Sequence, residues 1–213
     1  MNSPQQLTAS ATQFRDANSS DIEGVVATHA TAFPAFFLTR LGPQFLTQLY
    51  RAFREESGGV CVVALLGDEV VGFVSGTIEP EGFFRKVLRR RWAGFLFSGL
   101  GALLKHPLVV GERFLSALRY RGEIPEKLIG TGALLSSIAV RPQCGGRGLG
   151  SALINEFVAR ARAANCSYVF LTTDADENDK VTGLYERYGF QCESRLTRRD
   201  GRRMNRYVLL LTR

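Results

Sequence analysis

The segment Leu134–Gly150, LLSSIAVRPQCGGRGLG, constrains the fold more than any other part of the chain. Its first half is apolar apart from two serines, which predicts a strand covered on both faces of a sheet. Arg141 and Pro142 end this strand, and a cluster of glycines follows. From Ser151 to Ala163 apolar side chains recur at helical spacing. The pattern predicts a buried strand that leads through a glycine-rich turn directly into a helix.

The glycine-rich turn has properties that suit a bound phosphate group. The first turn of a helix has backbone N–H groups without partners and carries a partial positive charge. Glycines let an anion approach closely and allow positive φ angles, and Arg147 adds a full positive charge. A tight turn whose glycines serve packing alone explains the same residues, so both interpretations remain open on this segment.

Two familiar phosphate-binding motifs do not fit the turn. A P-loop requires a lysine where this chain has Ser151, so that motif is excluded. A dinucleotide fingerprint, G-x-G-x-x-G, begins at Gly146 and Gly148 but has Ser151 in place of its third glycine. Asp174 does close the next predicted strand at a suitable distance for that fingerprint. A dinucleotide-binding enzyme is therefore retained only as a third alternative.

A third motif fits better. It consists of Gln or Arg, two residues, Gly, one residue and then Gly or Ala, placed after a V-x-P strand end; here Gly148 and Gly150 match it. The motif is typical of the GNAT superfamily of acyl-CoA-dependent N-acyltransferases, which the chain resembles from Leu134 to Leu211. One departure is that Gly145 stands where the family usually has Gln or Arg.

A second signature of that superfamily is also present. In the family an Asn after the next strand precedes a short helix that ends L-Y-x-x-x-G-F. This chain has Asn178, and then LYERYGF from Leu184 to Phe190. The resemblance implies an α/β (α+β) GNAT fold, with a mixed central sheet flanked by helices and a helical insertion before the central strand.

The resemblance also implies a reaction, the direct transfer of an acetyl group from acetyl-CoA to a primary amine without a metal. The backbone of Ile138 and Val140 is expected to contact the pantetheine arm between two splayed strands, and an N–H of Ile138 or Ala139 to stabilise the oxyanion. Tyr185 occupies the general-acid position, with an aromatic lid as its other interpretation. The expected cofactor-binding residues are Ile138, Ala139, Val140, Gly145, Gly146, Arg147, Gly148, Leu149, Gly150, Ser151, Asn178 and Tyr185.

The sequence does not assign a general base. Many relatives carry a Glu near the start of the central strand, but residues 130–135 contain no carboxylate. Glu79 is a candidate because it ends a predicted strand near the expected acceptor side. A chain of water molecules is the alternative route for the proton. The other carboxylates that remain open are Glu81, Glu123, Glu126 and Asp174.

The rest of the chain supplies a sheet and its covering helices. Ser20 and Glu23 resemble a capping box at the start of a helix that Phe33 and Pro34 end. Gly72 and Gly76 interrupt an apolar strand, and a bulge, a close backbone approach and a simple packing accommodation all remain open for each of them. The predicted strands are 13–16, 60–66, 69–78, 134–140, 167–174, 191–196 and 204–211, and a further predicted helix is 43–56.

Segment 82–126 is predicted to be a helical insertion. It combines five basic residues within 85–91 with an apolar stretch, 92–104, that is too short to cross a bilayer of roughly 30 Å as a helix. A second helix is expected through Phe114, Leu115 and Leu118. Three interpretations remain open: a lid over the acceptor, peripheral membrane contact through 83–118, and packing on the sheet.

Composition limits the architecture and the partners. The chain has 213 residues with 45% hydrophobic content, which is enough for a single domain over 1–213. A net charge of +7 favours anionic partners such as coenzyme A, and no nucleic acid is expected. Four scattered cysteines and two histidines predict no metal site and a reducing compartment. The polar N-terminus does not resemble a signal peptide, so a cytoplasmic location is expected.

The acceptor is expected to be a small molecule or an amino sugar, because the insertion offers a way to enclose a compact amine. Arg198, Arg199, Arg202 and Arg203 in the terminal hairpin raise the alternative of an acidic acceptor. Other hypotheses are a non-catalytic acyl-CoA sensor and a protein N-terminal or lysine acetyltransferase. The oligomeric state stays open between a monomer and a homodimer.

Overall fold

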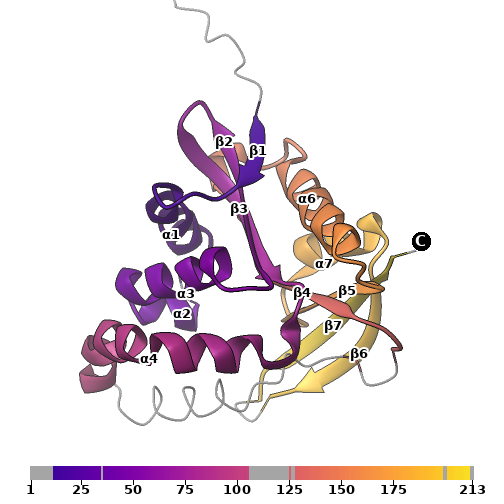
Figure 1. The fold of residues 1–213 in the computed structure, drawn as a ribbon. Coiled ribbons are helices and arrows are strands. Elements are labelled where there is room, and N and C mark those ends of the chain that lie inside the picture. The colour runs from indigo at the N-terminus through magenta and orange to yellow at the C-terminus, as the bar shows by residue number, and fades with distance from the viewer. Residues whose placement is uncertain (1–11, 35, 106–124, 126–127, 199–200, 212–213) are drawn as a thin grey trace, which may run out of the picture.

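A computed structural model describes residues 12–34, 36–105, 125, 128–198 and 201–211, and shows one mixed sheet with helices on both faces (Figure 1). The strand order is β1-β2-β3-β4-β5-β7-β6, and every neighbouring pair is antiparallel except β4 with β5. The predicted mixed sheet is confirmed. Its strands are β1 (Gln13–Asp16), β2 (Gly59–Leu66), β3 (Glu69–Thr77), β4 (Gly132–Val140), β5 (Tyr168–Asp174), β6 (Gln191–Thr197) and β7 (Arg203–Leu210).

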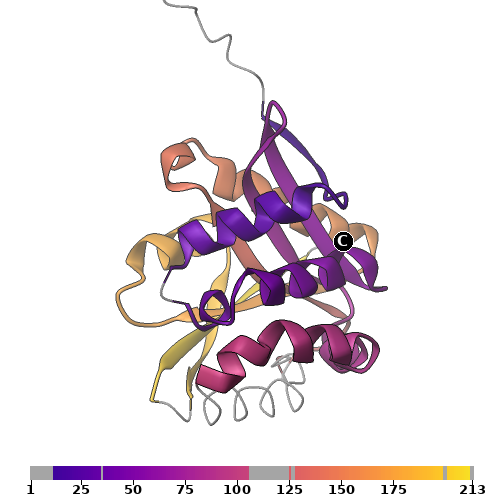
Figure 2. The same ribbon diagram turned by 90° about the vertical axis from the view of Figure 1, so that its left-hand side faces the viewer.

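Two layers of helices bury the two faces of the sheet. On one face lie α1 (Asp21–Ala32), α2 (Phe37–Arg40), α3 (Pro43–Glu55) and α4 (Pro80–Lys105); on the other lie α6 (Leu149–Ala163) and α7 (Asp179–Tyr188) (Figures 1 and 2). Strand alternation produces this division. In β2, Val62 and Ala64 join the core on the α6 face, whereas Cys61 and Val63 join the core beneath α1 and α3.

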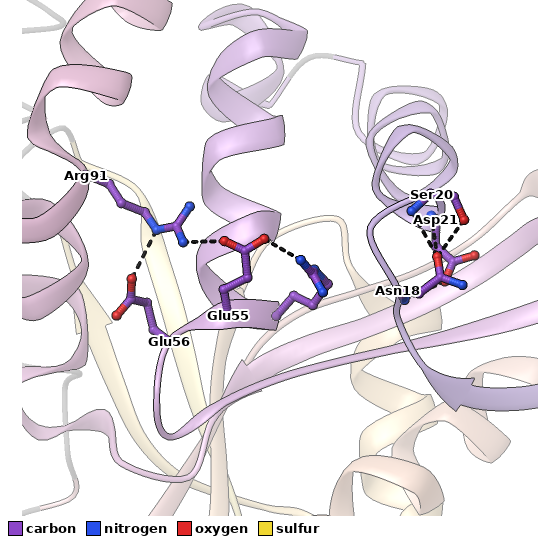
Figure 3. Close-up of polar contacts among 7 residues, drawn as sticks. Asn18, Ser20, Asp21, Glu55, Glu56 and Arg91 are labelled. Carbon is purple, nitrogen blue, oxygen red and sulfur yellow. Dashed lines mark hydrogen bonds and ion pairs between the residues drawn. The ribbon is translucent and has the colours of Figure 1, made fainter.

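The start of α1 differs from the predicted capping box. Ser20 already has helical backbone angles, and its side chain makes no capping hydrogen bond. Instead, the Oδ1 atom of Asn18 accepts hydrogen bonds from the backbone N–H and hydroxyl of Ser20 and from the N–H of Asp21 (Figure 3). The capping-box prediction is therefore wrong, because a serine within the first helical turn cannot reach the amides that its own turn exposes. The predicted helix end at Phe33 is confirmed.

The described part of the insertion packs against α3. The backbone of α4 is not helical at Glu81, Gly82 and Arg91, so the element consists of helical pieces joined at kinks. Phe83 is fully buried and stacks on Phe53 of α3 with 5.5 Å between ring centroids. Phe84 of the same element packs against a buried cluster of the sheet, formed by Leu134, Tyr168, Phe170 and Val208. The second helix predicted around residues 114–118 lies outside the described residues.

Ion pairs also hold α4 to α3. Arg91 donates from Nε to Glu56 at 3.1 Å and from Nη2 to Glu55 at 2.5 Å (Figure 3). Trp92 and Phe97 on the same element are exposed at 61% and 74%. None of the helices within the described ranges is both long and apolar enough to cross a membrane.

Candidate functional site

The central feature of the sheet is the place where β4 and β5 part. They pair in parallel only from Gly132 with Tyr168 to Leu134 with Phe170, although both strands continue beyond those residues (Figure 1). Residues 135–140 of β4 therefore have no strand partner on the β5 side. We call this region, with residues 171–174 of β5, the β4–β5 opening.

A bulge in β4 accompanies the parting. Ser137 pairs with Ser75 of β3 and Leu135 pairs with Gly76, so Ser136 is an extra residue in β4. A side chain at Gly76 would come within 2.1 Å of the Leu134 carbonyl oxygen, which is a backbone atom of the next strand. Only glycine tolerates that approach. Of the interpretations left open for this glycine, the close backbone approach is the one that the structure shows.

The ladder between β3 and β4 decides which backbone groups face the opening. The N–H of Arg141 donates to the Val71 carbonyl at 2.8 Å, so that residue's backbone points toward β3. Because backbone groups alternate along a strand, those of Ala139 also point toward β3, and those of Ile138 and Val140 point toward the β4–β5 opening. Of the two predicted oxyanion donors, only Ile138 has this orientation.

The glycine-rich turn follows directly at the end of β4. Gly146 and Gly148 have φ angles of +75° and +76°, and a side-chain carbon at either position would meet nothing within 4 Å. Their requirement for glycine is therefore conformational, and the packing-only interpretation does not explain them. Gly145, by contrast, has a φ of −64°, and its N–H donates to the Pro142 carbonyl at 3.1 Å.

Helix α6 begins with unsatisfied backbone donors. Gly148 is its N-cap and provides no side-chain hydrogen bond. The first intrahelical bond runs from the Ala152 N–H to the Gly148 carbonyl, so the N–H groups of Leu149, Gly150 and Ser151 have no helical partner. Arg147 is exposed beside them. An anion here would meet three directed N–H groups, the positive end of a helix and a cation.

Helix α7 brings Leu184, the neighbour of Tyr185 in sequence, close to this helix start. A side-chain carbon at Gly150 would lie 3.3 Å from Leu184, so the two helices approach closely there. Tyr185 is 4% exposed, and its ring contacts Phe190 and Tyr207 at centroid distances of 5.6 and 6.1 Å. Burial raises the pKa of its phenol well above the ordinary value, so the hydroxyl keeps its proton at neutral pH. The residue has the protonation state that an acid requires.

Asn178 ties the start of α7 to the end of β5. Its Nδ2 donates to the Thr173 hydroxyl at 2.7 Å and to the Asp174 carbonyl at 3.0 Å. It is the N-cap residue of α7, but its side chain makes no capping hydrogen bond. Its amide group is therefore held at the β5 end of the opening, where a ligand lying between the strands would emerge.

The candidate base Glu79 lies at the opposite end of β4 from the glycine turn. Its carboxylate is 56% exposed and pairs with Lys86 at 3.6 Å. Thr77 pairs with Leu134, and Ile138 is four residues further along β4, or about 13 Å at the rise of a strand. This separation does not favour Glu79 as a base at Ile138. Glu81 is exposed nearby, while Glu123 and Glu126 fall outside the described residues.

Three segments meet around the end of β5. Asp174 accepts two hydrogen bonds from Nη2 of Arg202 at 2.6 and 2.9 Å, and that guanidinium lies 5.9 Å from the Phe36 ring centroid. The loop after α1, the hairpin β6–β7 and the end of β5 are therefore joined. Arg203 pairs with Asp176, so Arg202 and Arg203 both have carboxylate partners. Arg199 is not among the described residues.

Metal ligands do not gather in the parts of the chain that the structure describes: there, no three His, Cys, Asp or Glu side chains come together in a way that would hold an ion.

Known proteins resemble this chain in part of its sequence and in its fold. Residues 114–190 match the model of the Acetyltransferase (GNAT) family. No curated protein sequence matches the chain. Among solved structures, Ard1 from Thermoplasma volcanium superposes with a TM-score of 0.62 at 19% identity, covering 95% of this chain and 99% of that one.

Two further structures share the fold. The ribosomal-protein-S18-alanine N-acetyltransferase from Escherichia coli gives a TM-score of 0.59 at 13% identity and covers 95% of both chains. A chain of the NatC complex bound to Gag peptide and CoA gives a TM-score of 0.58 at 12% identity, covering 94% of this chain and 99% of that one. At these identities the structures establish the fold, and the predicted fold class is confirmed.

Proposed function

From its place in the GNAT acetyltransferase family, we propose that this protein transfers an acetyl group from acetyl-CoA to a primary amine of a small molecule or an amino sugar. The observation that carries the proposal is the β4–β5 opening, which ends at the exposed N-terminus of α6. An extended thioester with a charged pyrophosphate matches both parts. The strand backbone suits the amide-bearing arm, and the helix start suits the anion.

The geometry supports an assignment of the binding residues. The N–H groups of Leu149, Gly150 and Ser151 receive the pyrophosphate, with Arg147 as the neighbouring cation. The backbone groups of Ile138 and Val140 pair with the amides of the pantetheine arm, as a third strand would. The absence of side chains at Gly146 and Gly148 leaves room for the phosphate oxygens.

The chemistry requires an oxyanion donor and an acid. Acetyl-CoA supplies a thioester carbonyl with a leaving group that departs as a thiolate. The N–H of Ile138 donates to the carbonyl oxygen while the amine nitrogen forms the new C–N bond. Tyr185 gives its proton to sulfur as the C–S bond breaks, and the amine loses one proton to water. No carboxylate among the described residues is assigned as the base.

Amine-dependent thiol release tests the proposal. Purified protein is incubated with acetyl-CoA and a panel of primary amines that contains a polyamine, an amino sugar and peptides with free N-termini. We expect release of coenzyme A that depends on the small amines. Turnover confined to peptides would instead support protein N-terminal acetylation, the activity named for the Escherichia coli neighbour. CoA binding without turnover of any amine would support the sensor hypothesis.

The acid role of Tyr185 has a separate test. Tyr185→Phe is expected to lower kcat about 100-fold while acetyl-CoA affinity stays unchanged, because only the proton donor is removed. Tyr188→Phe is the matched control, because the Tyr188 hydroxyl donates a hydrogen bond to Oδ1 of Asn155 on α6 at 2.5 Å. Equal rates for the two variants would exclude the acid role.

A further inference from the structure

The side of α4 that points away from α3 carries cations and aromatic rings together. Helix α4 lies at one end of its layer, with α3 between it and α1 (Figures 1 and 2). Val87 and Phe95 of α4 are buried in the core that α3 also lines. Four side chains of the same element are exposed, and we call them the outer patch of α4: Arg85, Arg89, Trp92 and Phe97.

The outer patch lies in a part of the chain whose charges are all positive. Residues 82–105 contain no Asp or Glu. Arg90 and Arg91 pair with Glu56 at the end of α3, whereas Arg85 and Arg89 make no ion pair within the described ranges. Two like charges one turn apart destabilise a helix, so Arg85 and Arg89 do not serve the stability of α4. Their charge is presented to the solution.

The aromatic part of the outer patch is not explained by folding either. An aromatic ring gains free energy when it leaves water, yet Trp92 and Phe97 are exposed at 61% and 74%. Phe95, between them, is buried and lies 5.1 Å from the Phe45 ring of α3 between centroids. Residues 92–104 carry no charge. The outer patch therefore changes along the helix from cations to apolar rings.

We propose that the outer patch of α4 docks the protein on an anionic bilayer surface. Arg85 and Arg89 contact the phosphate-bearing headgroups, and Trp92 and Phe97 enter the boundary between headgroups and acyl chains. A bilayer offers these two environments in adjacent layers, which matches the order of side chains along the helix. A nucleic acid duplex presents phosphates along its whole length and would leave the uncharged half of α4 without a partner.

This proposal limits the membrane contact expected for 83–118 to the described face of α4, and it does not rest on the proposed acyl transfer. Vesicle sedimentation of the full-length protein tests it without acetyl-CoA or an amine. The vesicles contain phosphatidylcholine with about one third phosphatidylglycerol, or phosphatidylcholine alone. We expect at least about tenfold stronger binding to the anionic vesicles, and weaker binding as salt increases. Equal binding to both kinds of vesicle, or no binding, would overturn the proposal.

Two double variants that change the net charge equally locate the docking surface. Arg85→Gln combined with Arg89→Gln is expected to weaken binding to anionic vesicles at least about tenfold, because each arginine at the surface contributes to the attraction. Arg162→Gln combined with Arg187→Gln is the control, since both residues are exposed on α6 and α7, which cover the opposite face of the sheet. Equal losses in the two double variants would contradict the assignment of binding to α4.

The fluorescence of Trp92 reports on the outer patch directly, because the chain has a single tryptophan. In solution we expect the emission of a water-exposed indole, quenched by acrylamide. Anionic vesicles should shift the emission to shorter wavelength, and lipids brominated in their acyl chains should quench it. An indole that acrylamide does not reach, an unshifted emission from vesicle-bound protein, or a shift caused by duplex DNA and not by vesicles would each overturn the proposal.

The apolar contribution has its own variant, which keeps Trp92 as the reporter. Phe97→Ser is expected to weaken vesicle binding several-fold, because less apolar surface leaves water on docking. Val181→Ser is the control, since Val181 is also exposed, at 38%, but lies on α7. Binding of Phe97→Ser equal to that of Val181→Ser would contradict the insertion of the aromatic rings.

Discussion

The buried side chain of His29 makes the stability of the protein depend on pH. Its pKa falls from an ordinary 6.5 to about 4 because burial disfavours the charged imidazole. Between these two values the unfolded chain binds more protons than the folded one, so the free energy of unfolding decreases as pH falls from about 6.5 toward 4. At pH 5 this loss amounts to about 2 kcal/mol relative to neutral pH.

The His29→Gln variant checks this expectation. Glutamine cannot titrate in this range but can still accept the proton of the Tyr50 hydroxyl, whose oxygen lies 2.5 Å from Nδ1 of His29. Denaturant unfolding at pH 7 and pH 5 should therefore show a smaller decrease in stability for the variant, by about 2 kcal/mol, than for the wild type. An equal decrease in both proteins would mean that His29 is not buried as a neutral group.

A substitution at Gly148 tests whether the turn binds coenzyme A, and a control with the same backbone strain separates this effect from a loss of stability. Its φ of +76° makes alanine unfavourable by about 1–2 kcal/mol, although no atom obstructs the side chain. Gly82, in α4, has a φ of +79° and equally open surroundings, so Gly82→Ala carries the same strain away from the turn. Calorimetry should show at least a tenfold loss of coenzyme A affinity in Gly148→Ala and none in Gly82→Ala. Equal affinities would contradict a phosphate site at this turn.

For single residues, the sequence predicts the roles that depend on residues nearby in the chain. Gly148 follows a strand and precedes a periodic helix, and its positive φ is a consequence of that local order. The hydrogen bond between His29 and Tyr50 was not predictable, because the two residues belong to different elements. Asn18 was missed because the cap comes from outside the predicted motif.

Among the elements, α4 is the one whose position depends most on charge. Burial alone raises the pKa of Glu56, but hydrogen bonds from Arg91 and Arg90 outweigh it and hold that pKa below its ordinary value. Arg91 is 20% exposed, whereas Arg90 is 62% exposed. The two arginines therefore bind one buried carboxylate from very different environments.

Substitution of Arg91 should therefore reduce stability more than substitution of Arg90. Arg91→Leu is expected to reduce the free energy of unfolding by about 2–3 kcal/mol at pH 7, because Glu56 keeps a buried charge with weaker compensation. Arg90→Ala should cost less than about 1 kcal/mol. The contribution of a carboxyl with a lowered pKa is present at neutral pH and decreases as pH falls through that pKa, so the Arg91→Leu loss should shrink in acid. Equal losses at pH 7 would contradict the difference between the environments of the two arginines.

Helix periodicity and turn residues predicted most elements near their observed bounds, including α3 and the β2–β3 hairpin. The kink at Arg91 was not predictable, because the carboxylates that bind its side chain are about 35 positions earlier in the chain. The parting of β4 and β5 came only from the family resemblance. Apolar patterning predicts that a strand exists, but the residue at which its pairing ends depends on the neighbouring strand.

For the whole molecule, strand order and the position of the site are connected. The one parallel pair of the sheet, β4 with β5, is also the pair that separates, and α6 begins at the end of β4. The β4–β5 opening, the glycine-rich turn and the start of α6 therefore follow one another along the chain. The contacts of Arg202 with Asp174 and Phe36 join segments that are far apart in the chain, so no sequence motif predicted them.

Calorimetric titration of the purified protein with acetyl-CoA, coenzyme A, NAD and ATP, in parallel and at equal salt, tests this arrangement most directly. We expect acetyl-CoA and coenzyme A to bind at one site per chain, and NAD and ATP to bind far more weakly, because only the acyl carrier occupies both the β4–β5 opening and the start of α6. Tighter binding of NAD, or no binding of either coenzyme A species by the folded protein, would contradict the proposed site and the transferase built on it.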